Sequence, residues 1–77
     1  MNKQRRKELD KAHTLLIEAQ EIINGVRTDE EDARENMPEN LYYSERAEQM
    51  EEYCYTLEDA ENALDDLLSN LIEIIEG

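Results

Sequence analysis

Clustered carboxylates are the residues of this chain whose types and spacing could do chemistry. Among its 77 residues are 21 Asp and Glu but only eight Lys and Arg, for a formal net charge of −13 at pH 7. Neighbouring acids such as Asp65 with Asp66, or Glu51 with Glu52, could in principle act as general acid and base. That chemistry needs a sheltered pocket that moves two pKa values apart. Adjacent residues on a helix point about 100° apart, so these pairs do not predict an enzyme.

The acidic run Asp29-Glu30-Glu31-Asp32, followed by Glu35, could instead ligate a cation. A calcium loop of the EF-hand type places oxygen ligands at alternate positions and a glycine at its sharp turn. This run has no glycine and lies in a helical pattern, so its carboxylates would point around a helix. The single cysteine, Cys54, and the single histidine, His13, exclude sites built from several residues of either type. We therefore expect no metal and no cofactor, with His13 flanking a helix seam and Cys54 packed as a small residue.

Two series of apolar residues predict the elements that carry these carboxylates. In both series the spacing alternates between three and four residues, which is the heptad pattern of paired helices. The first series has one polar member and consists of Leu9, Ala12, Leu16, Ala19, Ile23, Val26, Glu30, Ala33 and Met37. The second consists of Met50, Tyr53, Leu57, Ala60, Leu64, Leu67, Leu71 and Ile74.

The segment between the two series predicts a turn. Pro38 pushes Met37 out of helical geometry and ends the first helix, and Ser44 is a good N-cap for the second. The expected fold is all-α, one domain over residues 1–77: an antiparallel two-helix coiled-coil hairpin with a helix at about 3–36, a turn at 37–43 and a helix at about 44–76. In the expected register, the two seam residues that lie opposite each other have residue numbers that sum to 80, as do Ile23 and Leu57. This register holds along the whole hairpin.

The dipeptide Asn24-Gly25 is the weak point of the first helix, because Asn-Gly is a turn sequence. Thr28 and Glu31 have capping-box spacing and could start a new helix. The heptad nevertheless continues in phase through Val26, and a single glycine costs a helix only about 1 kcal/mol. We therefore expect a continuous helix.

Several apolar residues lie outside both series, so the apolar surface is wider than a two-helix seam needs. They are Leu15, Ile17, Ile22, Leu68, Ile72 and Ile75. A surface of this width is typical of a four-helix bundle, and we expect a homodimer of hairpins.

Charge is distributed unevenly along the chain. Residues 28–77 hold 17 of the acids, with Arg34 and Arg46 as their only bases. So acidic a surface is repelled by nucleic acid and by anionic membranes. No apolar run approaches the length of a membrane span and no signal-peptide pattern is present, so we expect a cytoplasmic protein. The basic cluster Lys3-Arg5-Arg6-Lys7 is expected to pair with the acids near Glu73 and Glu76.

An ordered acidic surface of this kind indicates recognition of a basic protein surface. The candidate partner-binding acids lie in the second helix, and two tyrosines without a core duty, Tyr42 and Tyr55, could anchor an arginine-rich partner by cation–π contacts, whereas Tyr43 and Tyr53 are expected to pack. Alternatively, the tyrosines only close the hairpin end. The candidate acids are Glu48, Glu51, Glu52, Glu58, Asp59, Asp65 and Asp66.

The stretch Asn36-Met37-Pro38-Glu39-Asn40-Leu41, the segment 44–52 (SERAEQMEE) and Leu57-Glu58-Asp59-Ala60 together carry a resemblance. The chain resembles small uncharacterised acidic helical-hairpin proteins of phages and mobile elements of Gram-positive bacteria. That resemblance implies an accessory role and no catalytic residue. With the charge asymmetry, it leads to the hypothesis of an inhibitor that binds a basic, nucleic-acid-binding host defence protein such as a nuclease, by nucleic-acid mimicry or occlusion. The alternatives are a structural coiled-coil scaffold and an antitoxin-like neutraliser of a basic toxin.

Overall fold

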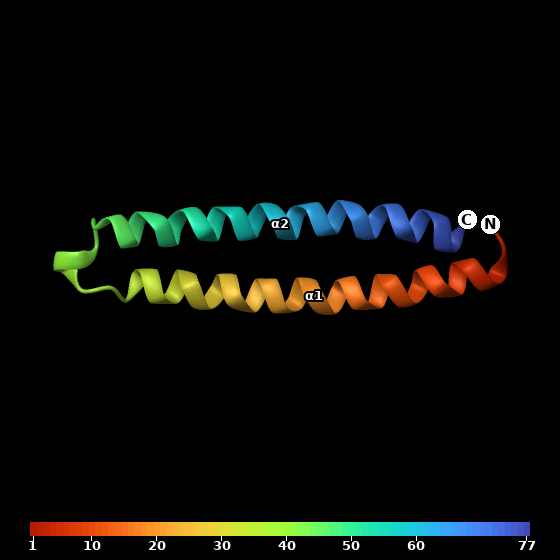
Figure 1. The fold of residues 1–77 in the computed structure, drawn as a ribbon, viewed down its shortest axis with the longest axis horizontal. Helices are drawn as coiled ribbons and strands as arrows, with labels where there is room; N and C mark the ends of the chain where they lie inside the picture. The colour runs from red at the N-terminus through yellow and green to blue at the C-terminus, as the bar shows by residue number, and fades with distance from the viewer.

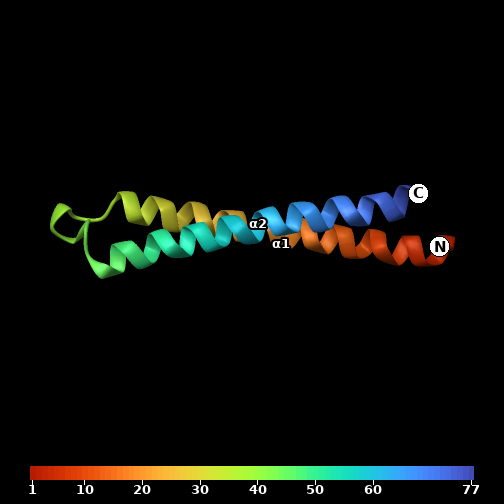
Figure 2. The same cartoon turned by 90° about the horizontal axis from the view of Figure 1, so that it is seen from above.

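Two long helices run antiparallel and side by side through a computed structural model that describes residues 1–77 (Figures 1 and 2). Helix α1 spans Lys3–Glu35 and helix α2 spans Glu45–Glu76, with a short 3₁₀ helix, η1, at Glu39–Leu41 between them. The Cα trace measures 60 × 15 × 13 Å, and both termini lie at the end opposite the turn. The structure confirms the all-α helical hairpin, and each helix begins and ends within one residue of its expected bounds.

Side-chain caps define where both helices begin. The Ser44 side chain accepts a hydrogen bond from the Ala47 backbone N–H at 3.3 Å. Glu45 and Glu48 lie in the first turn of α2, where their negative charges interact favourably with the positive end of the helix dipole. At the start of α1, the Asn2 side chain accepts from the Arg5 N–H at 2.8 Å. Ser44 is therefore the N-cap that its residue type predicts.

Helix α1 is continuous through Asn24 and Gly25, as the uninterrupted heptad predicted. Gly25 lies on the exposed side of the helix, and a Cβ atom added there would meet nothing within 4 Å. The glycine is therefore not needed for a close approach between the helices. It only increases the conformational entropy that the backbone loses when the helix forms.

Replacing Gly25 with alanine is expected to stabilise the protein by about 1 kcal/mol, because alanine loses less backbone entropy in a helix. For a chain of this size the melting temperature should rise by about 4–8 °C. Thermal unfolding followed by circular dichroism at 222 nm checks this directly. A lower melting temperature would contradict a straight helix at this position.

The seam between α1 and α2 confirms half of the predicted heptad positions and corrects the other half. The shared positions, such as Ile23 and Leu57, are half-buried as expected. At the alternate position the buried side lies one residue later than predicted at several levels, so that Arg27 replaces Val26 and Cys54 replaces Tyr53. The predicted Ala12, Ala19 and Ala60 are half-buried, each beside a seam residue that follows it. The observed seam of α1 is Arg6, Leu9, His13, Leu16, Gln20, Ile23, Arg27, Glu30, Arg34 and Met37. That of α2 is Ala47, Met50, Cys54, Leu57, Glu61, Leu64, Leu68, Leu71 and Ile75.

The difference arises because polar side chains occupy one seam position of α1 throughout its length. They recur every seven residues and, being polar, do not contribute to the apolar periodicity: Arg6, His13, Gln20, Arg27 and Arg34. The register changes with the seam. Cross-helix hydrogen bonds and ion pairs join residues whose numbers sum to 81–88, whereas the predicted sum was 80. The arms are therefore displaced by about one helical turn.

That displacement also explains the basic cluster near the N-terminus. The first turns of α1 reach past the C-terminal end of α2 (Figure 1). Lys3, Arg5, Arg6 and Lys7 form no ion pair, and Lys11 pairs only with Glu8 of its own helix at 3.9 Å. The expected pairing of this cluster with Glu73 and Glu76 was wrong. Separately, neither α1 nor α2 combines the length and the apolar character that crossing a membrane requires.

Candidate functional site

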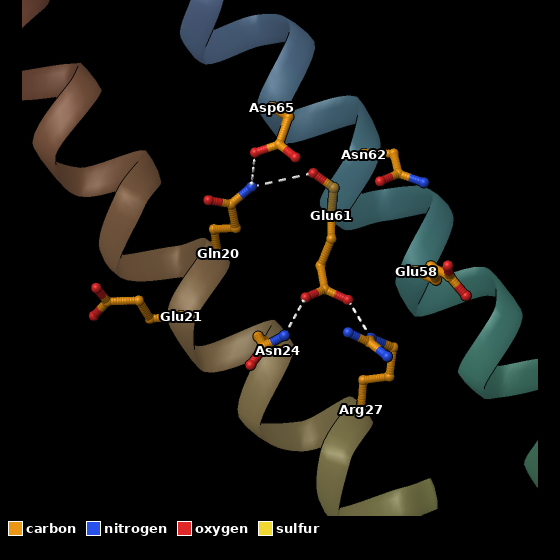
Figure 3. A pocket seen from close by; sticks show the side chains of 8 residues that line it. All are labelled: Gln20, Glu21, Asn24, Arg27, Glu58, Glu61, Asn62 and Asp65. Carbon is orange, nitrogen blue, oxygen red and sulfur yellow. Dashed lines mark hydrogen bonds and ion pairs between the residues drawn. The ribbon is translucent and has the colours of Figure 1, made fainter.

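A polar network crosses the seam at mid-length, centred on the buried carboxylate of Glu61 (Figure 3). Asn24 donates from Nδ2 to Glu61 Oε1 at 2.7 Å, and Arg27 donates from Nε to Glu61 Oε2. Gln20 Nε2 donates to the Glu61 backbone carbonyl at 3.2 Å and to Asp65 Oδ1 at 2.6 Å. Both oxygens of Glu61 therefore have a partner on α1.

These bonds hold both members of the ion pair in their charged forms. The hydrogen bond from Arg27, followed by that from Asn24, lowers the pKa of Glu61. The bonds of Arg27 to Glu61 and to Glu31 (2.7 Å) raise the pKa of the guanidinium. A carboxylate so stabilised in its charged form is a poor proton donor or acceptor near neutral pH. The network is thus suited to hold the two helices in register.

Sequence reasoning missed this network because each of its members is an ordinary surface residue type. One signal could have found it: the recurrence of polar residues every seven positions in α1, in phase with the leucines of the seam. Glu61 occupies the equivalent heptad position of α2. Together with the recurrence in α1, it indicates a seam that is partly polar.

A second cluster closes the turn end of the hairpin. The guanidinium carbon of Arg34 lies 4.0 Å from the centroid of the Tyr42 ring, and Arg34 Nη2 pairs with Glu51 at 3.1 Å. Tyr42 in turn contacts Tyr43 edge to face, with ring centroids 5.3 Å apart. Tyr42 therefore has a structural contact at the turn, in line with the alternative that it closes the hairpin end. Tyr43, which was expected to pack, is 87% exposed.

The candidate acids lie together on the outer side of α2. We call this set the acidic ridge: Glu45, Glu48, Glu51, Glu52, Glu58, Asp59, Asp65 and Asp66, all exposed. Three adjacent pairs (51/52, 58/59 and 65/66) recur every seven residues, which is about 10.5 Å along the helix. All seven acids that the sequence nominated belong to the ridge, which adds Glu45.

Most of the acidic ridge is free of countercharge. Glu51 pairs with Arg34, and Asp65 accepts from Gln20; the other ridge acids form no ion pair. Tyr55 is exposed and lies three or four residues from both the 51/52 and the 58/59 pair, so it shares their side of the helix. The ridge therefore presents carboxylates around one exposed aromatic ring.

The remaining reactive residue types are placed within the seam. Cys54 is half-buried, and burial, followed by the nearby charges of Glu31 and Glu30, raises the pKa of its thiol. His13 is half-buried at a seam position. No group of three or more His, Cys, Asp or Glu side chains has an arrangement that could hold a metal ion.

Comparison of the chain with protein-family models, with curated proteins and with solved structures gave no match. Function is therefore inferred from the chemistry of these surfaces.

Proposed function

We propose that this chain is a small acidic interaction module that binds a basic surface of another protein through the acidic ridge. The observation that carries the proposal is the density of charge along a single helix. Nine acids, eight of them in the exposed ridge, occupy the 22 residues from Glu45 to Asp66, which span about 32 Å at 1.5 Å per residue. Arg46, at the start of α2, is the only base of that helix.

This charge density is close to that of a nucleic-acid strand. The acidic ridge has about one carboxylate per 4 Å, and one strand of B-form DNA has one phosphate per about 3.4 Å of axis. A groove lined by Lys and Arg to hold nucleic acid would attract the ridge at long range and speed the encounter. The partner in this proposal is therefore a basic, nucleic-acid-binding protein, such as a nuclease, whose groove the ridge occupies.

The biological setting in this proposal is that of an accessory protein of a phage or mobile element, acting in the cytoplasm of a bacterial host against a defence protein. Its support is the resemblance carried by the turn and the start of α2, together with a mode of action that needs occupancy and no catalysis. An interaction module that acts by occupancy requires exposed charge on an ordered element, and helix α2 carries such charge.

A structural scaffold is the second candidate, favoured by the apolar residues that remain exposed along the hairpin. Leu15, Ile22 and Val26 of α1, for example, are each more than half exposed. In a scaffold, the acidic ridge would serve solubility, and binding to a partner would resist salt.

Affinity capture from bacterial lysate at low and high salt, read by mass spectrometry, separates the two candidates. The bait is the unaltered chain beside two triple variants with the same change in net charge. One reverses the acidic ridge (Glu52→Lys, Asp59→Lys, Asp66→Lys), and its matched control reverses exposed acids on the outer side of α1 (Glu18→Lys, Asp32→Lys, Glu35→Lys).

We expect the unaltered chain and the α1 control to capture a basic protein at low salt and to release it at high salt. The ridge variant should bind that protein about 100-fold more weakly, equivalent to about 2.7 kcal/mol. Equal capture by both variants would sink the proposal. Equal loss by both would assign binding to net charge, without a role for the ridge.

A further inference from the structure

One side of the hairpin is apolar over most of its length and is not covered by any other part of the chain. We call it the apolar face: Ala12, Leu15, Ala19, Ile22 and Val26 of α1, with Tyr53, Ala60, Ala63, Leu67 and Ile74 of α2. Its six large side chains are 41–68% exposed. No acidic or basic residue interrupts these positions, although 38% of the chain is charged.

Both helices contribute to the same side of the molecule. Val26 of α1 and Tyr53 of α2 line one shallow groove together with Leu57, Thr56 and the seam residue Glu30. In an antiparallel pair, the residues that immediately precede one seam position on each helix fall on a common side. Most of the apolar face consists of residues whose heptad spacing had predicted them in the seam. Their periodicity is therefore real, and packing within one hairpin does not account for it.

The hairpin by itself lacks a core. Ala47 is its only buried apolar residue, and no large side chain is fully buried. The accessible surface is 5977 Å², whereas a folded monomer of 9.1 kDa typically exposes about 4900 Å². The excess of roughly 1100 Å² compares with the roughly 800 Å² that each partner buries in a stable interface.

We propose that the apolar face binds a second copy of this chain, and that two hairpins pack antiparallel, turn end to open end, as a four-helix bundle. The apolar face fits itself because it is centred at mid-hairpin. Ala19 of α1 and Ala63 of α2 lie near its middle, with the large side chains on either side. A two-fold axis through this centre brings the same residues of both copies together, and the small alanines let the helices approach closely.

Charge selects the antiparallel arrangement. The turn half of the hairpin, residues 20–61, has 14 acids and three bases, for a net charge of −11. The open half, residues 1–19 and 62–77, has seven acids and five bases, for a net charge of −2. Parallel packing would set the two strongly acidic halves side by side. Antiparallel packing brings Lys3, Arg5 and the other unpaired bases of one copy alongside the acidic turn half of its partner.

The acidic ridge stays outside this interface, because its residues lie on the side of α2 away from the apolar face, where Glu51 and Asp65 contact α1. The inference is therefore independent of the proposed function, and the two can fail separately. A dimer that binds no basic protein refutes the proposed function alone. A monomer that binds such a protein refutes the dimer alone.

Sedimentation equilibrium of the unaltered chain at 10–200 µM (roughly the range in which dimers of standard interface size persist) is the first test. We expect a mass twice the 9.1 kDa of the chain. The variant Ile22→Glu/Leu67→Glu should have the mass of a single chain. Asn62→Glu/Ser69→Glu, which adds the same charge at exposed polar positions, should remain a dimer. A 9.1 kDa mass for the unaltered chain would overturn the proposal, even if the Ile22→Glu/Leu67→Glu variant failed to fold.

The arrangement of the two copies is tested by one spin label at the turn, introduced as Asn40→Cys in a Cys54→Ala background. Pulsed electron paramagnetic resonance then measures the separation of the two turns. In the antiparallel dimer it should approach the 60 Å length of the hairpin. A separation below about 20 Å, two helix diameters, would mean parallel packing and would overturn the charge argument.

Discussion

Replacing Glu61 with leucine is expected to lower the melting temperature by about 10 °C or more, because the half-buried guanidinium of Arg27 loses its carboxylate partner across the seam. Arg27 donates to Glu61 from the seam, and Asn24 donates to the other carboxylate oxygen. Leucine accepts neither hydrogen bond. Thermal unfolding followed by circular dichroism measures the loss.

A double variant separates the ion pair from the packing around it. In Arg27→Leu/Glu61→Leu no seam charge is left unpaired at this level, and most of the lost stability should return. If the double variant were as unstable as the sum of the two single variants, the pair would carry no coupling and its assigned role would be wrong.

The same comparison has a defined pH dependence. The pKa of Glu61 is lowered in the folded chain, so its contribution is complete above the unfolded carboxyl pKa of about 4.3 and is lost as pH falls through the lower, folded value. The gap in melting temperature between the unaltered chain and Glu61→Leu should be full at pH 7 and should narrow below about pH 4. A gap independent of pH would assign the effect to side-chain volume.

Replacing Arg34 with alanine should cost about 2 kcal/mol, the sum of a cation–π contact and an ion pair at the turn. The guanidinium lies 4.0 Å from the Tyr42 ring centroid, and the side chain is only 11% exposed. Urea unfolding should show the loss as a lower midpoint with an unchanged slope.

The two tyrosines of the turn provide an internal control. Tyr42→Leu should remove the cation–π contact, and a double-mutant cycle with Arg34→Ala should give a coupling of about 1 kcal/mol. Tyr43→Leu, at a position that is 87% exposed, should change stability by no more than about 0.5 kcal/mol. A larger loss at Tyr43 than at Tyr42 would reverse their assigned roles.

The hairpin could be predicted because its signals are local. Pro38 ends a helix and Ser44 begins one through their own covalent structure, and apolar residues such as Leu16 and Leu64 repeat with the period of a packed helix. The alternate seam position could not be read in this way. Arg27 is a surface residue by type, and only the carboxylate of Glu61, 34 positions away in the chain, makes a place for it between the helices.

In the candidate site, too, local features could be predicted and contacts between distant residues could not. Exposure of acids such as Asp59 and Asp66 follows from their charge, since unpaired carboxylates remain in water. The contacts of Tyr42 and Tyr43 depend on the path of a turn that has no periodicity, and sequence pattern assigned the packed and the exposed ring the wrong way round.

The polar pair at mid-seam also determines how the two arms can be aligned. Leucines spaced seven apart would accept several alignments of α2 against α1, each displaced from the next by one heptad. In either neighbouring alignment the place of Glu61 opposite Arg27 would be taken by Cys54 or Leu68, and the guanidinium would keep only its bond to Glu31 of its own helix. One arginine and one glutamate therefore make the native alignment more stable than alignments displaced by one heptad. A chain that folds into a displaced alignment is expected to unfold again more readily.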